Sequence, residues 1–276
     1  MPEGDTIFRA AQSLHRVLSG HPVTRFETAY AHLDRVDVDT PIAGRVIEKC
    51  HSAGKHLLMV FSGDLILRTH MRMNGSWHLY RPGERWWRGE QMMRIRIDTA
   101  DWVAVAFNVP VAEFVTSKQL ATRDPVAQLG PDLLGESFDR DDAIRRIVAS
   151  GHRAIAQTLL DQRILAGIGN VYKSEVLFMS AVHPETSSSA VPLATLERMM
   201  DIARGVLRDN VVAGSSPRIQ TYRNLRQSNP ASEHDESLWV YGRRGKPCRK
   251  CGTPIEMKKM GLEARSTYWC PNCQTL

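Results

Sequence analysis

Residues 248–273 read CRKCGTPIEMKKMGLEARSTYWCPNC, which places four of the five cysteines in two Cys-x-x-Cys pairs with 18 residues between them. Two such pairs can hold four thiolates at the corners of a tetrahedron, the geometry of a structural zinc site that leaves no position open for substrate. Two disulfides are the alternative, but the spacing and a reducing compartment favour zinc. The predicted metal ligands are Cys248, Cys251, Cys270 and Cys273.

The stretch between the pairs is predicted to form a β-hairpin, because Gly252, Pro254 and Gly261 flank short extended runs. Basic residues crowd about 35 positions around it, namely Arg243, Arg244, Lys246, Arg249, Lys250, Lys258, Lys259 and Arg265. A solvated charged face without function is the alternative, but a rigid, metal-bound hairpin of this composition commonly grips phosphates. Because the whole chain carries a formal charge of +6, we favour nucleic acid as the partner.

The 276 residues, 42% of them hydrophobic, suffice for two domains with sizeable cores. No stretch approaches the roughly 20 apolar residues that span a bilayer. The first 20 positions carry Glu3, Asp5, Arg9 and Arg16, where a signal peptide would be apolar. We therefore expect a cytoplasmic protein without membrane association. The isolated Cys50 is interpreted as a core thiol.

The first half of the chain is expected to be one helix followed by a β-rich region. Apolar residues between Ile7 and Leu18 recur at helical spacing, with Asp5 or Thr6 able to cap the start and Gly20 able to end it. From residue 23 to about 114 the pattern changes to short extended runs, including 56–61, 64–70, 93–98 and 102–107. This pattern indicates a β-sandwich or barrel.

The second half is expected to be helical, after a boundary near 125–135. Helical periodicity covers 139–148, 154–165, 171–180 and 192–211. Between the second and third of these helices stands Ala166-Gly167-Ile168-Gly169-Asn170, a glycine turn that leads into a helix start. Backbone amides at such a start can bind an anion, and an ordinary helix-helix turn with Asn170 as the cap is the alternative.

The sequence begins Met1-Pro2-Glu3-Gly4, so removal of Met1 would leave a secondary amine beside a carboxylate. An α-amine titrates near ~8 and is in part an unprotonated nucleophile at neutral pH. Such amines attack electrophilic carbons, and a proline nitrogen can form only a cationic iminium. The positive end of the following helix would help to keep the amine deprotonated. An accident of translation start is the alternative interpretation of Pro2.

Five motifs, in this order, resemble the formamidopyrimidine-DNA glycosylase and endonuclease VIII family. They are the start at 1–4, Gly54-Lys55-His56, the segment LAGIGNVY at 165–172, Val240-Tyr241-Gly242-Arg243 and the terminal cysteine motif. The Met-Pro-Glu-Gly opening looks more like the endonuclease VIII branch. The resemblance implies an α+β multidomain fold, with an N-terminal β-sandwich and flanking helix over 1–127, a helix-two-turn-helix domain over 128–240 and a zinc-finger β-hairpin over 241–276.

The resemblance also implies an activity, that of a bifunctional DNA glycosylase and AP lyase of base excision repair that removes oxidised bases, chiefly pyrimidines. Pro2 would attack the sugar C1′ of a flipped nucleotide, Glu3 would protonate the ring oxygen, and Lys55 would contact the phosphate near the lesion. Successive β and δ eliminations would then cut the strand. The resemblance implies one structural Zn²⁺ and no nucleotide or redox cofactor. The expected partner is damaged, mainly duplex DNA, and we expect a monomer.

By the same resemblance, Arg72, Met73 and Asn74 fill the gap left by the flipped base, with Met73 as the wedge. A place in the hydrophobic core is the alternative for Met73. Asn170 matches a helix-two-turn-helix residue that binds backbone phosphate, and Arg265 matches the finger arginine that grips the phosphates flanking the flipped nucleotide.

The chain departs from the family pattern at Thr6, where a glutamate is common, and at 107–110, where Phe-Asn-Val-Pro replaces an Arg-x-Phe-Gly loop. The opposite-base preference therefore stays open, and so does the role of 213–236, which stands where other members carry lesion-contacting loops. Glu175 also matches a family position, but a helix-surface or capping carboxylate is the alternative, so it is not assigned to the catalytic residues. Trp86 and Trp87 are predicted to pack on a hairpin rather than to stack on bases.

Three other functions are alternatives. An oxidised-purine glycosylase is the nearest of them. A non-catalytic zinc-finger DNA-binding protein would explain the charge, the glycine turn and the finger without using Pro2. An RNA-binding zinc-ribbon protein would explain the finger but not the glycine turn or the β-rich first half.

Overall fold

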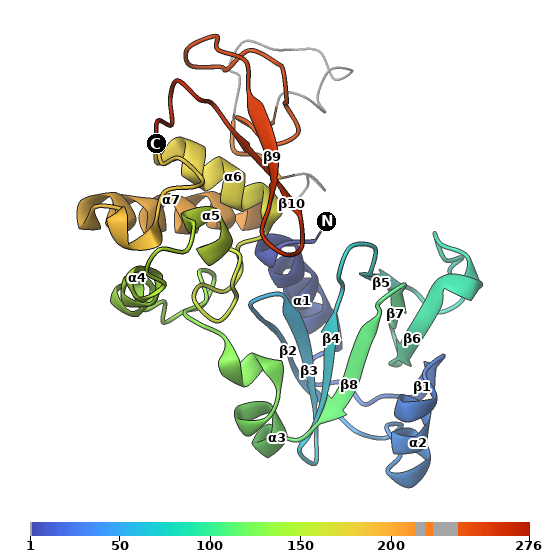
Figure 1. Cartoon of the computed structure of the whole chain (residues 1–276). Coiled ribbons are helices and arrows are strands. Elements are labelled where there is room, and N and C mark those ends of the chain that lie inside the picture. Colours follow the sequence, from blue (N-terminus) through green and yellow to red (C-terminus); the bar gives the residue numbers. More distant parts are fainter. Residues whose placement is uncertain (1, 213–218, 223–236) are drawn as a thin grey trace. The chain divides into compact units, whose positions relative to one another are not determined.

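The computed structural model describes residues 2–212, 219–222 and 237–276. The chain, drawn as a ribbon in Figure 1, divides into two units, Met1–Gln128 and Leu129–Leu276. Each unit has its own hydrophobic core. Met1 and most of 213–236, for which the resemblance implies lesion-contacting loops, lie outside the described residues. Among the described helices, none combines the length and the apolar character that a membrane crossing requires.

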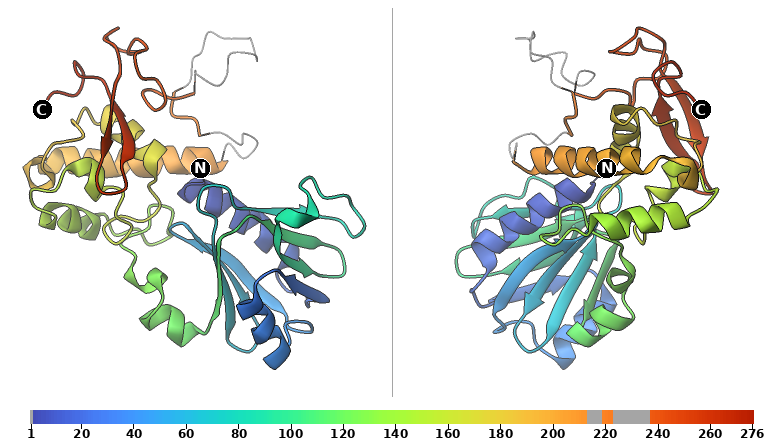
Figure 2. Two further views of the ribbon diagram at one scale, coloured as in Figure 1. Left: turned by 45° about the vertical axis from the view of Figure 1, so that its right-hand side comes forward. Right: turned by 90° about the vertical axis from the view of Figure 1, so that its left-hand side faces the viewer.

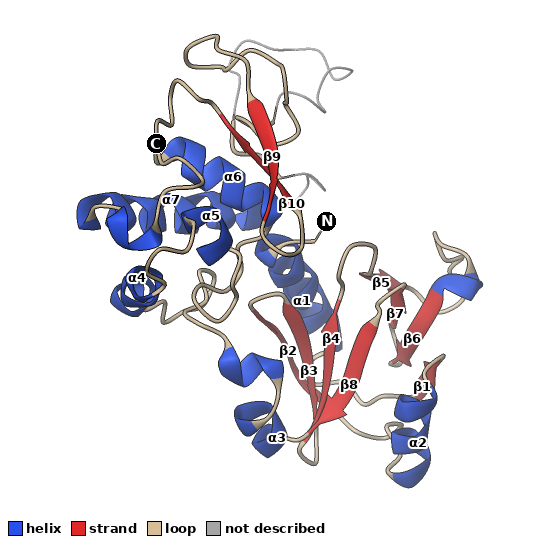
Figure 3. Cartoon of the chain, in the orientation of Figure 1, coloured by secondary structure: helices blue, strands red, loops and turns tan. Residues whose placement is uncertain are grey.

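The first unit is built from two four-stranded antiparallel sheets and three helices (Figure 3). The helices are α1 (Gly4–Leu18), α2 (Ala31–Asp39) and α3 (Ser117–Thr122), with 3-10 turns at Glu90–Met92 and Pro125–Gln128. The strands are β1 (Arg25–Thr28), β2 (Ile47–Ala53), β3 (His56–Phe61), β4 (Leu65–His70), β5 (Ser76–Tyr80), β6 (Met93–Asp98), β7 (Val103–Phe107) and β8 (Val111–Val115). One sheet has the order β1-β6-β7-β5 and the other β2-β3-β4-β8.

One hydrophobic core joins both sheets to α1, which confirms the predicted sandwich and its flanking helix. Alternation along the strands sends Ile95 and Ile97 of one sheet and Leu57 and Met59 of the other into this core. Ile7, Leu14 and Leu18 of α1 also lie in it. The four predicted extended runs appear as β3, β4, β6 and β7, and Cys50 is buried as expected.

The prediction that Asp5 or Thr6 caps the first helix is wrong. The helix begins at Gly4, with Glu3 in the N-cap position in an extended conformation, and the amide of Ile7 donates to the carbonyl of Glu3 at 3.1 Å. Asp5 therefore lies inside the first turn, where it pairs with Arg9 at 3.4 Å. The predicted end is confirmed, because Gly20 follows the helix with φ of +83°.

Helix α2 lies in a stretch for which the sequence pattern predicts only extended runs. Leu33 is its one buried residue, so the helix carries almost no amphipathic signal. Its position depends on tertiary contacts, including a hydrogen bond between the His32 ring and the carbonyl of Ala112 at 2.7 Å.

The second unit is helical apart from a C-terminal hairpin (Figure 2). Its helices are α4 (Arg140–Ala149), α5 (Ile155–Thr158), α6 (Asn170–Met179) and α7 (Leu193–Val212), with a 3-10 turn at Ser188–Ala190. The hairpin consists of β9 (Glu256–Met260) and β10 (Arg265–Trp269), as predicted between the cysteine pairs. Val240, Ile255 and Phe178 form a small core beneath it.

The helix predicted over 154–165 is wrong beyond Thr158, where α5 ends. The carboxylate of Asp161 accepts from the amide of Arg163 at 3.1 Å and from its guanidinium at 2.8 and 3.0 Å. A short acidic side chain that bonds to the backbone two residues on favours a turn over a helix. The apolar periodicity of this stretch comes from buried turn residues such as Leu165.

Candidate active site, phosphate contacts and metal centre

The start of α1 brings together the amine and the carboxylate of the predicted catalytic pair. Pro2 is partly buried, and Glu3 is fully buried in the N-cap position of the helix. The unpaired amides of a helix N-terminus carry partial positive charge, which opposes protonation of a nearby amine and favours a carboxylate. The chain positions this pair simply by beginning a helix at Gly4, immediately after it.

Lys55 lies at the tip of the hairpin that joins β2 to β3. Ala53 pairs with His56, so Gly54 and Lys55 form a two-residue loop, and Gly54 has φ of +55°. A glycine at the first position of such a loop provides the positive φ that matches the twist of the strands. Lys55 is partly exposed and close enough to His70 to lower the pKa of that ring.

Two histidines that the sequence interpretation did not single out lie beside Lys55. Strand register pairs His56 with His70, and their rings stand 4.9 Å apart, edge to face. Burial, followed by the charges of the neighbouring His70 and Arg68, lowers the pKa of His56 to about 3. Burial, followed by the charges of Arg72 and Lys55, lowers the pKa of His70 to about 4. Both rings are therefore neutral at physiological pH.

Buried Arg68 forms an ion pair with Asp124 and also contacts one of these histidines, His56. Arg68 is 3% exposed, and its guanidinium lies 2.6 Å from Asp124 and 2.5 Å from Glu113. One of its nitrogens is also 3.3 Å from Nδ1 of His56. Because a buried guanidinium needs a charged partner, this cluster ties β4 to Glu113 of β8 and to Asp124.

The loop between β4 and β5 presents the three predicted gap-filling residues to solvent. Arg72, Met73 and Asn74 are all exposed, Met73 to 57%, whereas Met71 is buried. A core position is therefore wrong for Met73, and its role as a wedge stays a prediction. The turn closes through a hydrogen bond from the amide of Gly75 to the carbonyl of Met71, at 2.9 Å.

The glycine turn before α6 does not place Asn170 at the N-cap, where the helix-helix turn alternative predicted it. Gly169 is in the N-cap position, and Asn170 is the first helical residue, 7% exposed. Its amide nitrogen donates to the carbonyl of Ser266 at 3.0 Å, and its amide oxygen accepts from Lys173 at 2.7 Å. Asn170 thus joins the helix to strand β10.

Two buried charges of α6, not predicted as functional, organise the finger. Lys173 is fully buried and donates to Thr267 at 2.7 Å as well as to Asn170. Glu175 is also fully buried, so a surface position is wrong for it. Its carboxylate accepts from the hydroxyl of Thr221 and from the amides of residues 239, 240 and 241 at 2.7, 2.9 and 2.8 Å. No sequence spacing signals these long-range contacts.

The side chains of the four clustered cysteines fit a tetrahedral metal. Their sulfur atoms all lie within 4.8 Å of one another, and the nearest pairs are 3.4 and 3.9 Å apart. Four sulfurs at about 2.3 Å from a zinc ion stand about 3.8 Å apart, whereas a disulfide bond measures about 2.0 Å. The two-disulfide alternative is therefore wrong, and a structural zinc ion fits. Hydrogen bonds from Thr253 lower the pKa of Cys251 to about 5, whereas burial raises the pKa of Cys270 and Cys273, so a metal ion at this site would have to displace protons from those two thiols.

The finger's basic residues divide into structural and exposed groups. Arg243, predicted to be presented at the surface, is instead 6% exposed and donates to the carbonyls of Trp239 and Pro247 at 2.6 and 2.9 Å. Arg265 begins β10 and is partly exposed, and its guanidinium lies 2.6 Å from Glu263. An exposed pair of this kind contributes little stability, so a phosphate can replace the carboxylate at small cost.

Three protein-family models match the chain in order. The formamidopyrimidine-DNA glycosylase N-terminal domain matches residues 1–111, the formamidopyrimidine-DNA glycosylase H2TH domain matches 129–221, and the zinc finger found in FPG and IleRS matches 245–276.

Curated relatives align along almost the whole chain. The "Probable endonuclease 8 2" of Streptomyces coelicolor is 37% identical over 99% of this chain and 94% of its own length. The "DNA-(apurinic or apyrimidinic site) lyase Nei2" of Mycolicibacterium smegmatis is 36% identical over 100% of this chain and 99% of its own length. Among solved structures, Lactococcus lactis Fpg in complex with DNA containing an abasic site gives a TM-score of 0.81 at 23% identity, covering 100% of both chains. Because the identity is only 23%, this structural similarity shows that the two proteins share a fold and nothing more.

Proposed function

Because this chain belongs to the formamidopyrimidine-DNA glycosylase and endonuclease VIII family, we propose that it is a bifunctional DNA glycosylase and AP lyase of base excision repair. The observation that carries the proposal is the pair Pro2 and Glu3 at the start of α1, where the carboxylate is fully buried beside the predicted amine. Two relatives are named endonuclease 8 and AP lyase, which matches the endonuclease VIII branch that the opening of this sequence resembles. Because that resemblance implies oxidised pyrimidines, we propose them as the excised bases.

We propose that the reaction begins when the amine of Pro2, freed by removal of Met1, attacks the sugar C1′ of the damaged nucleotide. The nitrogen–carbon bond forms as the bond to the base breaks; the Glu3 carboxylate takes the proton of the amine, and the leaving base takes a proton from solvent. Glu3 then gives its proton to the sugar ring oxygen as the bond between that oxygen and C1′ breaks. The product is a cationic iminium, which acidifies the C2′ protons. Loss of one such proton expels the 3′ phosphate, and a second elimination expels the 5′ phosphate. Water then releases Pro2 from the sugar fragment.

The other site residues are assigned to binding. Lys55, at the tip of its hairpin, would contact the phosphate near the lesion, with neutral His56 and His70 behind it. Exposure of Arg72, Met73 and Asn74 suits side chains that enter the gap in the stack. In the second unit, Asn170 and Arg265 are assigned to backbone phosphates, and the zinc ion held by the four cysteines would fix the strand that carries Arg265.

We also propose that the partner is mainly duplex DNA, that the enzyme acts as a cytoplasmic monomer, and that one zinc ion is its cofactor, without a nucleotide or redox group. The domains are proposed at 1–127, 128–240 and 241–276. The two-unit division at 128/129 and the separate finger core are compatible with these boundaries.

Borohydride trapping tests the proposal. Mature protein is incubated with a duplex that contains one oxidised pyrimidine, and the same experiment is run with extra residues fused to the N-terminus. Because the fusion turns the amine of Pro2 into an amide, we expect a covalent complex with the mature protein and at least about a hundredfold less with the fusion. Extra residues after Leu276, an exposed position, are the matched control and should leave trapping unchanged.

Two outcomes would contradict parts of the proposal. Equal trapping by the N-terminal fusion would exclude Pro2 as the nucleophile. Preferential trapping on a duplex with an oxidised purine would replace the pyrimidine assignment, and absence of trapping on both duplexes and on an abasic duplex, by zinc-loaded protein that binds DNA, would leave a non-catalytic DNA-binding protein.

A further inference from the structure

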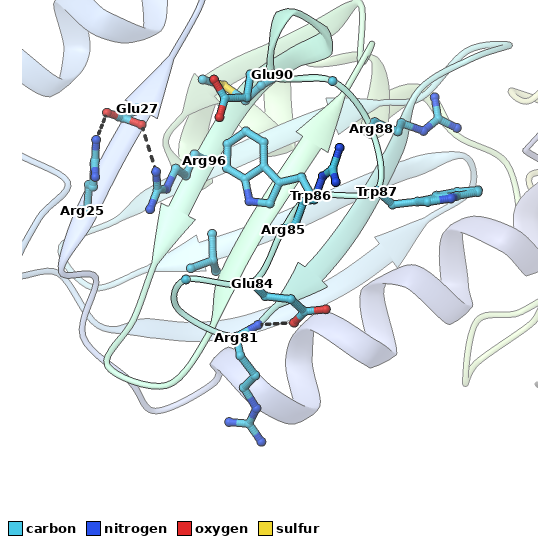
Figure 4. A pocket seen from close by; sticks show the side chains of 14 residues that line it. Arg25, Glu27, Arg81, Glu84, Arg85, Trp86, Trp87, Arg88, Glu90 and Arg96 are labelled. Atoms are coloured by element: carbon cyan, nitrogen blue, oxygen red, sulfur yellow. Dashed lines mark hydrogen bonds and ion pairs between the residues drawn. The ribbon is translucent and has the colours of Figure 1, made fainter.

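The outer face of the sheet β1-β6-β7-β5 carries a pocket of about 800 Å³ that the proposed chemistry does not use (Figure 4). It lies under the loop from Arg81 to Met92, which joins β5 to β6. Val103, which lines the pocket, belongs to a small hydrophobic cluster with Tyr80 and Phe107, on the side of the sheet that faces away from the sandwich core. Arginine, glutamate and tryptophan side chains make up most of the wall.

The loop packs the side chain of Trp86 against the sheet and leaves most of the side chain of Trp87 exposed to solvent. Trp86 packs edge to face on Phe107, with ring centres 5.7 Å apart, and its predicted role in packing is confirmed. The amide of Trp87 donates to the hydroxyl of Tyr80 at 3.2 Å, yet its own side chain is 78% exposed. The Trp87 ring also lies 5.7 Å from the ring of His78 on β5, so hairpin packing accounts for one side of the indole, while most of it is exposed to solvent.

Some charged side chains around the pocket have an oppositely charged or aromatic partner, and two arginines have no ion pair with any residue that the structure describes. Glu27 pairs with Arg25 and Arg96, and Arg81 stacks on Trp102 with its guanidinium carbon 3.9 Å from the ring centre. Within the described part of the chain, no ion pair is found for Arg85 or Arg88. Figure 4 shows Arg88 on the same side of the pocket as Trp87, and its guanidinium carbon lies 5.8 Å from that indole.

We propose that Trp87, Arg85 and Arg88 form a second DNA-binding site, specific for unpaired nucleotides. An exposed, immobilised indole offers a stacking surface to any base, and adjacent guanidinium groups without carboxylate partners match the phosphates of the same strand. In a duplex the base faces are covered by their neighbours, so only an unstacked base can use this surface. The inference rests on the proposed function in taking DNA as the partner, but it does not involve Pro2.

The test is the affinity of the full-length protein for an undamaged 12-nucleotide oligothymidylate and for an undamaged duplex of the same length, measured by fluorescence anisotropy. Stacking on one aromatic side chain contributes about 1–3 kcal/mol per base, so Trp87→Ala should weaken single-strand binding by at least about fivefold and duplex binding by less than twofold. Trp87→Phe keeps an aromatic face and should restore most of the loss.

The arginines are tested by the salt dependence of the same binding. Two phosphate contacts on a single strand account for a slope of about 1.4 in log affinity against log salt, so the double variant Arg85→Ala/Arg88→Ala should lose about that much. Arg35→Ala removes an exposed arginine from α2, outside the pocket, and is the matched control.

Unchanged single-strand affinity in Trp87→Ala would overturn the proposal and leave the indole as a contact for another protein. An equal loss for single strand and duplex would also overturn it. Thermal unfolding of each variant checks that the loop is intact, which the exposure of Trp87 leads us to expect. Borohydride trapping reports separately on Pro2, so a failure of this inference is distinguishable from a failure of the proposed function.

Discussion

At the scale of single residues, this protein buries charges where they position other groups. Arg68 is held between Asp124 and Glu113, and in the second unit Lys173 and Glu175 are both fully buried with several hydrogen-bond partners each. Burial of a charge is unfavourable unless partners surround it, so each of these residues constrains the geometry around it. The histidines next to Arg68 take part in the same arrangement in their neutral form.

The two histidines predict a dependence of stability on pH. Their pKa values are about 3 and 4 in the folded state, below the usual 6.5, so the unfolded chain binds protons that the folded chain does not. The contribution of the two neutral histidines to the free energy of unfolding is therefore fully present above about pH 6.5 and is lost as the pH falls toward 4. Between pH 7 and pH 5 the loss should be up to about 2 kcal/mol for each histidine. Urea unfolding at the two pH values measures it.

The variant His56→Gln/His70→Gln should lose most of this pH dependence. His152→Gln, which replaces an exposed histidine of the second unit, should keep it. An equal loss of stability between pH 7 and pH 5 in the double variant and in the unmodified protein would show that other groups carry the effect.

At the scale of elements, the loop between β4 and β5 depends on one glycine. A Cβ atom on Gly75 would lie 2.5 Å from the carbonyl oxygen of Met71 and 2.9 Å from its Cα, both backbone atoms. The close approach lets the turn reverse within 71–75 and hold Arg72, Met73 and Asn74 outward. The strand pairing on either side fixes where the loop begins and ends.

Gly75→Ala should therefore destabilise the fold by about 1–3 kcal/mol and displace the loop. Thermal unfolding measures the first effect, and affinity for a duplex with an abasic site measures the second, which we expect to fall several-fold. Gly205→Ala is the control, because that glycine lies inside α7 with no atom within 4 Å of the added Cβ. It should stabilise the protein by up to about 1 kcal/mol. Unchanged DNA affinity in Gly75→Ala would show that the loop does not contact DNA.

At the scale of the whole molecule, the chain forms two units with separate cores, and the finger in the second unit has only a small core of its own. So little buried apolar surface does not hold a hairpin of this size together, so we expect metal binding at the four cysteines to supply the missing stability. The buried side chains of Lys173 and Glu175 on α6 form hydrogen bonds with Thr267 and Trp239, and these bonds connect the finger to α6.

We expect one zinc ion per chain, measured by elemental analysis, and its removal by a chelator should lower DNA affinity at least about tenfold while the sandwich stays folded. Cys270→Ala, at a fully buried ligand, should lose the metal. Cys50→Ala is the matched control, because that buried thiol lies in the sandwich and burial raises its pKa to about 12. A chain that holds zinc after Cys270→Ala would contradict the four-cysteine site.

The sequence by itself determined the features that depend on local spacing. The cysteine pairs predicted the metal site, the start at 1–4 predicted the amine and carboxylate before a helix, and alternation of apolar residues predicted four of the strands. The glycine turn at 166–170 predicted where α6 begins. Each of these signals lies within a few residues along the chain, where backbone geometry fixes the outcome.

Only the tertiary structure decided which distant residues meet. Strand register placed His56 beside His70, packing of the finger on α6 buried Lys173 and Glu175, and the anchoring of one loop on Phe107 left Trp87 exposed. The helix predicted over 154–165 ended at Thr158, because a local turn at Asp161 overrode an apolar pattern. Contacts between residues far apart in the chain leave no period in the sequence, so burial and pairing at these positions follow from the fold alone.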